Sequence, residues 1–268
     1  MEQFILSNFS FGLGSTVGFV AAFVVLNLGL VIFLGSKHIV ARAFAFMCFT
    51  TVTWTVLTSF VAASLKGAVV GNFLERLAFA LGLCTVFSLS YVCFVHATKK
   101  RNRRLEIFYF AVAIIMMRIT MNTNYIFLDG LWRSSVSWAG VQVWGCAEGP
   151  FAFVYYIFYG GSLLAGVIVL YIKAMKEYVV VKKNSLMNMI FIVLVGIIPV
   201  TITSIILPSF GIFQYDWVGG FFCVFWVSLT SYLLLKKEQS DQIFPVNIVK
   251  TELIIIAMIF LFGIAMFY

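Results

Sequence analysis

The stretch KKRNRR at residues 99–104 decides how this chain folds, because it places five cations within six residues between two long apolar runs. A segment with this charge crosses a lipid core only at a high free-energy cost. Short loops rich in Lys and Arg stay on the cytoplasmic side of a membrane. The stretch therefore sets the direction in which every neighbouring apolar run crosses.

The composition indicates an integral membrane protein. Of the 268 residues, 63% are hydrophobic and 10% are charged, and the mean hydropathy is +1.07. This is more apolar surface than a soluble domain can bury. The net charge of +8 does not indicate nucleic-acid binding, because the cations lie at the ends of apolar runs and form neither a basic patch nor an RNA-binding signature.

We expect an all-α fold, a polytopic transmembrane bundle of seven helices followed by an eighth C-terminal helix. The predicted spans are residues 12–34, 43–64, 74–95, 107–127, 150–172, 186–207, 217–235 and 253–268. Residues 1–240 would form one seven-helix domain, and residues 241–268 a linker with the last helix. That last run rises about 24 Å against a core of about 30 Å, so it either spans the membrane or lies partly buried in it.

The distribution of cations predicts the orientation of the bundle. Fourteen of the 18 Lys and Arg residues fall in the predicted inner loops and three in the outer ones. This bias places the N-terminus outside the cytoplasm, in a multi-pass protein of the cytoplasmic (inner) membrane. The acidic start at residues 1–3 is unlike a removable signal peptide, so we expect the first span to be retained.

Several local features predict how the helices pack. Gly14, Gly18 and Ala22 recur at every fourth position, which allows close approach of another helix, and ordinary packing is favoured over a dimer interface. Pro199 should kink its helix and leave a carbonyl for Thr203 or a water to satisfy. The long outer loop over residues 128–149 carries three Trp residues, typical of an aromatic belt at the membrane interface.

The pattern resembles the N-terminal seven-helix sensor region of bacterial histidine kinases over residues 10–237. The resemblance rests on ARAFAF at residues 41–46 with Trp54, LAFALG at residues 77–82, Gly149-Pro150, and IIP at residues 197–199. It implies a receptor that binds a small or amphipathic ligand and signals by helix rearrangement. In that family the seventh helix leads to cytoplasmic signalling domains, whereas here an eighth apolar run follows, so we expect a separate cytoplasmic partner.

The candidate ligand site centres on Arg118. This residue lies eleven positions, or about 16 Å, beyond Ile107 in its predicted span, where a cation requires a partner or water. Asn122 and Tyr125 follow at helical spacing on the same face. Glu148 or Asp216 would balance the charge from the acidic outer side. The alternative is that Arg118 extends toward the outer interface or forms a purely stabilising ion pair.

No residue set predicts catalysis, a metal or a cofactor. Paired carboxylates and Ser/His sets are lacking, and His38 and His96 have no other ligand type at suitable spacing. The five cysteines lack paired spacing, so we expect no structural disulfide. Two functions remain: a receptor with an outward-facing pocket, or a small transporter or channel-like protein, for which broken helices and midplane ionisable groups are typical.

Overall fold

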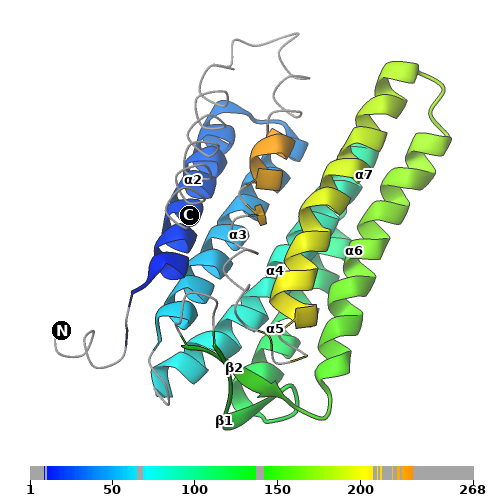
Figure 1. The fold of residues 1–268 in the computed structure, drawn as a ribbon. Coiled ribbons are helices and arrows are strands. Elements are labelled where there is room, and N and C mark those ends of the chain that lie inside the picture. The colour runs from blue at the N-terminus through cyan, green and yellow to red at the C-terminus, as the bar shows by residue number, and fades with distance from the viewer. Residues whose placement is uncertain are drawn as a thin grey trace.

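The computed structural model describes residues 9, 11–64, 69–136, 142–207, 210, 212, 219, 222–223 and 225–231. Within them, six helices are long and apolar enough to cross a membrane (Figure 1). The elements are α2 (Leu13–Gly35), α3 (Ile39–Ala63), α4 (Val69–Thr98), α5 (Arg103–Asn122), β1 (Phe127–Val136), β2 (Gln142–Glu148), α6 (Ala152–Met175), α7 (Val180–Thr201) and the π-helical turn η1 (Ile202–Ile206). This is the architecture of a multi-pass membrane protein.

The first six predicted spans are confirmed as helices, with their ends shifted. α4 begins five residues before its predicted start and α7 six residues before, whereas α5 ends five residues earlier than predicted. In the seventh predicted span, residues 222–223 and 225–231 are helical, but a complete crossing is not described. The eighth run, residues 253–268, lies outside the described residues.

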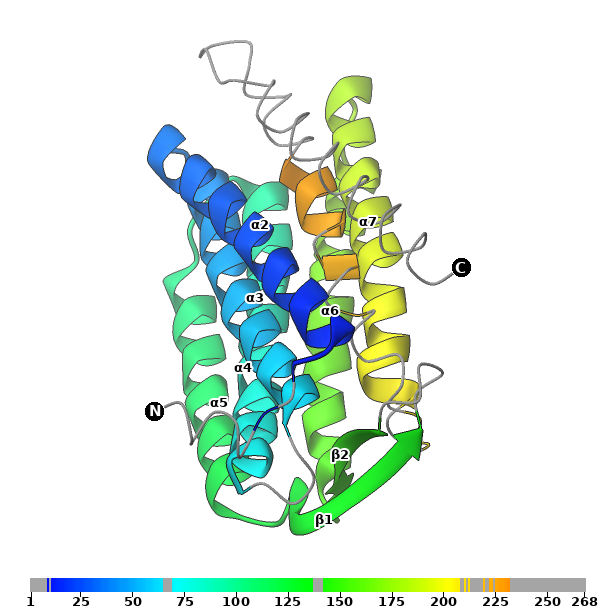
Figure 2. The ribbon, with the colours of Figure 1, turned by 60° about the vertical axis from the view of Figure 1, so that its left-hand side comes forward.

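Consecutive helices run in opposite directions, so the bundle has two distinct ends (Figure 1). The hairpin end carries the N-terminus of α2, the α3–α4 connection and the strands β1 and β2. The basic end carries the α2–α3, α4–α5 and α6–α7 turns, including the KKRNRR stretch. Figure 2 shows the hairpin lying across one end of the bundle, next to α5 and α6.

The KKRNRR stretch is a tight turn between two helices. α4 ends where Lys99 adopts a left-handed backbone with φ of 56°, and α5 begins four residues later. The Asn102 side chain accepts a hydrogen bond from the Leu105 backbone N–H at 3.2 Å and so caps the N-terminus of α5. The cations of the stretch therefore lie at the end of the α4–α5 pair.

α4 is the central helix of the bundle. In its most apolar stretch 72% of the residues are buried, against 11% for α5. α3, α5 and α6 all pack on α4, and α2 packs on the far side of α3. Phe44, Leu83 and Val92 are among the most completely buried side chains. α5 is thus a peripheral helix held mainly by one neighbour.

Small residues allow α2 and α3 to pack closely. A Cβ atom at Gly18 would lie 2.0 Å from the Ser59 hydroxyl oxygen, and one at Gly29 would lie 2.8 Å from Cys48 Cβ. Ala22 is also buried. The close approach at Gly18 thus serves packing within the chain, as favoured from the sequence.

An antiparallel β-hairpin connects α5 and α6. The sequence analysis placed residues 128–149 in a loop, which the structure corrects. The pairing joins Trp132 with Cys146 and Ser134 with Trp144, with a register irregularity between Phe127 and Trp132. Aromatic and β-branched residues on both strands favour this conformation, but their spacing is too irregular to give a strand pattern in the sequence.

The predicted disturbance at Pro199 takes the form of a π-helical turn. α7 ends at Thr201, and η1 follows directly over Ile202–Ile206. The Thr203 hydroxyl donates to the Pro199 carbonyl oxygen at 2.9 Å. The carbonyl that loses its donor at a proline is the one four residues earlier, at Val195, so this hydrogen bond is not the contact expected for Thr203. Three residues before the proline, a Cβ atom at Gly196 would lie 2.3 Å from Trp226 Cβ, so residues 225–231 pack directly on α7.

Candidate functional site

Arg118, Asn122 and Tyr125 lie on the surface at the hairpin end. Because α5 ends at Asn122, Arg118 stands one turn from the helix terminus and not near the middle of a span as expected. The Arg118 and Asn122 side chains are exposed, and the Asn122 amide donates to the Arg118 carbonyl oxygen at 3.0 Å. Tyr125 lies in the following turn, 55% exposed, with its ring 5.5 Å from that of Phe151.

The acidic partners proposed for Arg118 are not brought to it within the described residues. No carboxylate of the described chain forms an ion pair with the Arg118 guanidinium. Glu148, the last residue of β2, accepts a hydrogen bond at 2.5 Å from the Tyr156 hydroxyl of α6. Asp216 lies outside the described residues. The ligand-binding role of these five residues therefore stays a prediction.

A different arginine, Arg76 of α4, is buried at the hairpin end with an exposed fraction of 4%. Its Nη1 donates to the carbonyl oxygens of Thr120 and Thr123, each at 2.8 Å, and its Nη2 donates to Asn124 Oδ1 at 2.9 Å. The last carbonyls of a helix lack partners within the helix, and a cation there is favoured by the helix dipole. We call this set, Arg76 with Thr120, Thr123 and Asn124, the hairpin-end clasp.

The sequence analysis missed this role of Arg76 because it counted the residue as an outer cation. The preceding residue, Glu75, is also buried, with an exposed fraction of 7%. Two consecutive charged residues within an apolar run were the available signal, because intramembrane charges are rare and have specific partners. The identity of those partners depends on α5, more than forty residues further along the chain.

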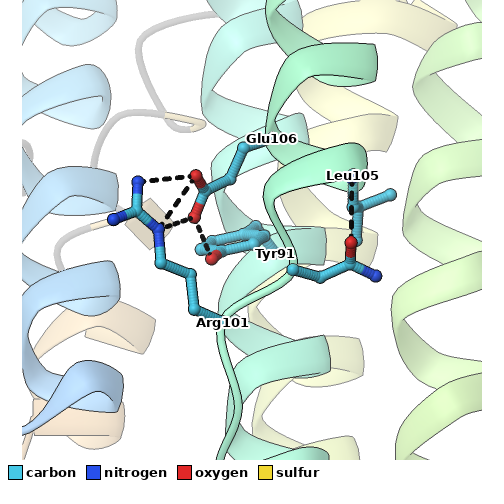
Figure 3. A network of polar contacts seen from close by, with 5 residues as sticks. Tyr91, Arg101, Leu105 and Glu106 are labelled. Carbon is cyan, nitrogen blue, oxygen red and sulfur yellow. Dashed lines mark hydrogen bonds and ion pairs between the residues drawn. The ribbon is translucent and has the colours of Figure 1, made fainter.

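A second polar cluster joins α4 and α5 at the basic end (Figure 3). The Arg101 guanidinium forms a bidentate ion pair with Glu106, with Nη2 to Oε2 at 2.8 Å and Nε to Oε1 at 2.9 Å. The Tyr91 hydroxyl of α4 donates to the same carboxylate. The hydrogen bonds from Arg101 to Glu106 raise the pKa of the arginine. We call Tyr91, Arg101 and Glu106 the basic-end clasp.

Between the two clasps, a further polar contact crosses the α4–α5 interface. The hydroxyls of Ser90 and Tyr109 are 2.8 Å apart, and the Tyr109 ring stacks on that of Phe87 with centroids 4.8 Å apart. α5 is therefore held to α4 near both ends and between them, while many of its apolar side chains, such as Phe110 and Ile114, are exposed.

The described residues bring together no group of three or more His, Cys, Asp or Glu side chains that could hold a metal ion. His38 caps α3 by accepting from the Val40 backbone N–H at 3.3 Å. His96 is buried near the basic end, with its Nδ1 3.5 Å from the Lys99 ammonium. Both histidines thus have local structural contacts.

No protein-family model matches the chain, and no curated protein matches it.

Proposed function

We propose that the chain is a membrane receptor in which α5 carries a ligand-induced change from the hairpin end, outside the cell, to the basic end in the cytoplasm. The observation behind this proposal is that both ends of α5 are clasped to α4 through polar side chains, whereas little of its apolar surface is buried. Such a helix can shift as a unit at a lower cost in packing than its neighbours.

The length of α5 suits this role. Its 20 residues form a rod about 30 Å long, which spans a hydrocarbon core. A displacement at one end of a rigid rod reaches the other end, where the basic-end clasp sets the geometry of the cationic turn. A separate cytoplasmic signalling protein would then respond to that turn.

The proposed ligand contacts alternate with the residues of the hairpin-end clasp. Arg118, Asn122 and Tyr125 are exposed. Within the same eight residues, the clasp uses Thr120, Thr123 and Asn124. A small or amphipathic ligand with a carboxylate or carbonyl group would meet the exposed set, and its binding would act directly on the clasped turn.

Distance measurements by electron paramagnetic resonance test the coupling. Spin labels at Phe108 of α5 and Val181 of α7, both exposed near the basic end, report on α5 in nanodiscs, in a background with cysteines replaced by alanine. We expect Arg76→Met, which opens the clasp at the opposite end, to shift or broaden the distance distribution. Gly161→Ala in α6, outside both clasps and with nothing within 4 Å of its Cβ position, is the control and should leave the distribution unchanged.

An unchanged distribution in a folded Arg76→Met protein would mean that the two ends of α5 are independent, and the receptor proposal would lose its basis. Retention of helical circular dichroism and of a single size-exclusion peak shows that the variant is folded.

The alternative function, a small transporter, is favoured by the break in α7. Pro199 and the π-helical turn η1 interrupt the regular hydrogen bonding of α7. Many transporters have interrupted membrane helices of this kind near their substrate sites. Uptake into proteoliposomes distinguishes the two functions: concentrative entry of a labelled carboxylate that also raises the thermal stability of the protein favours transport, and binding without entry favours sensing.

A further inference from the structure

We propose that the basic end is a docking surface for the headgroups of anionic phospholipids, and that these lipids form part of the folded assembly. This proposal is independent of whether the bundle senses or transports. It concerns the three turns of the basic end, residues 37–42, 99–104 and 173–183.

The charge of this surface is one-sided. Every Lys and Arg side chain in the three turns is exposed. In and beside these turns, the carboxylates that the structure describes are Glu106 and Glu177, and Glu106 is paired with Arg101. Lys99 contacts His96, and the other exposed cations give this end of the bundle a positive potential that attracts anionic groups.

The distribution of the cations favours a lipid layer over an acidic protein. All three turns carry exposed cations, so the positive charge is spread over three turns and is not gathered on one. A planar layer of phosphates contacts all three turns at once, whereas a single protein surface would fit one concentrated patch. Each Lys or Arg near an anionic leaflet contributes about a fivefold gain in affinity.

Exposed apolar side chains border the cations. On α5, Ile107 and Phe108 follow directly after the turn and are 67% and 53% exposed. On α6, Ile172 and Met175 stand beside Lys173 and Lys176 and are exposed as well. A phospholipid has a negative headgroup for the cations and apolar chains for the neighbouring apolar side chains. A free phosphate ion matches only the cations.

Two pairs of these cations also stand in the first turns of helices, Arg103 with Arg104 in α5 and Lys182 with Lys183 in α7. The helix dipole disfavours cations at this position. α7 has no acidic residue in its first turn and no side-chain cap. Lipid phosphate groups at this surface would offset the local repulsion. The position of these four cations therefore supports the proposal as well.

Lipid retention tests the proposal directly. The full chain is reconstituted in nanodiscs with equal amounts of phosphatidylglycerol and phosphatidylcholine and extracted in mild detergent, and the retained lipids are counted by mass spectrometry. We expect phosphatidylglycerol to be retained at least fivefold over phosphatidylcholine. The variant R103Q/R104Q/K182Q/K183Q removes four of these cations and should lower the ratio at least twofold, and R103K/R104K/K182R/K183R should preserve it.

If the glutamine variant fails to fold, measurements on the native protein still test the proposal. Extraction in about 0.5 M salt should reduce the enrichment at least twofold, because the Debye length then falls below 5 Å. Equal retention of the two lipids at low salt would overturn the proposal. Displacement of phosphatidylglycerol by millimolar inorganic phosphate would also contradict it, since the surface would then bind free anions.

Discussion

The guanidinium of Arg76 donates to the carbonyl oxygen of Thr120 at 2.8 Å, joining α4 to the last turn of α5 across 44 residues of sequence. Arg76 is buried, so this contact is shielded from solvent. The stability of α5 at its hairpin end therefore depends on a side chain of another helix.

Arg76→Met should lower the free energy of unfolding by about 2–3 kcal/mol, because it leaves the buried Thr120 carbonyl and the partly buried Thr123 carbonyl without their donor. Arg76→Lys should recover part of this loss, since one ammonium reaches fewer of the three acceptors. Denaturant titration in nanodiscs gives the values. A decrease in the free energy of unfolding below about 0.5 kcal/mol would mean that other donors replace the guanidinium.

Arg118→Met should leave thermal stability and expression nearly unchanged, because the Arg118 side chain is exposed and forms no ion pair within the described residues. If the receptor proposal holds, the same change weakens the binding of anionic ligands. Combined loss of stability and expression would show that Arg118 is instead a structural partner.

Gly149→Ala should destabilise the protein by more than about 2 kcal/mol. A Cβ atom at Gly149 would lie 2.5 Å from the carbonyl oxygens of Asn124 and Tyr125, which are backbone atoms and cannot rotate away. Gly161→Ala is the matched control, since nothing lies within 4 Å of its Cβ position in α6. That variant should be neutral or gain up to about 1 kcal/mol of helix stability. Thermal unfolding in detergent compares the two.

The losses in free energy of unfolding caused by two single substitutions should rank the two contacts of Glu106. Arg101→Gln should cost at most about 1 kcal/mol, because the Arg101 side chain is 59% exposed and its ion pair is screened by solvent. Tyr91→Phe removes a donor that is partly buried and should cost about 1–1.5 kcal/mol. A larger loss for Arg101→Gln than for Tyr91→Phe would contradict this order.

Reporter fusions test the orientation on which the functional proposal depends. Alkaline phosphatase fused at residue 138 should be active, and at residue 102 inactive, because the basic turn is placed in the cytoplasm. The reverse pattern would place the hairpin end inside the cell.

The positions of the helices were predictable because apolar runs between charged turns determine both where a helix crosses and where the chain reverses. The end of α5 was not predictable in this way, since Thr123 and Asn124 continue an otherwise polar stretch without a proline or glycine to mark it. That one boundary changes the depth of Arg118, from the middle of a span to its last turn.

The hairpin-end clasp was not predictable because it is a tertiary contact. The sequence places Arg76 near an outer boundary, but only the packing of α5 on α4 shows that its side chain turns inward to a helix terminus. The basic-end clasp has a partial local signal, since Arg101 and Glu106 are five residues apart, whereas Tyr91 joins them through the fold of the turn.

The burial of Arg76 also constrains the order of events during synthesis. When α4 leaves the ribosome, the carbonyl oxygens that accept from Arg76 have not yet been made. Until α5 emerges, the hydrogen bonds of the hairpin-end clasp cannot form, and a charged side chain within a membrane helix is costly while its acceptors are missing. We therefore expect α4 to remain beside the insertion machinery until α5 emerges, and the two helices to enter the bilayer as a pair.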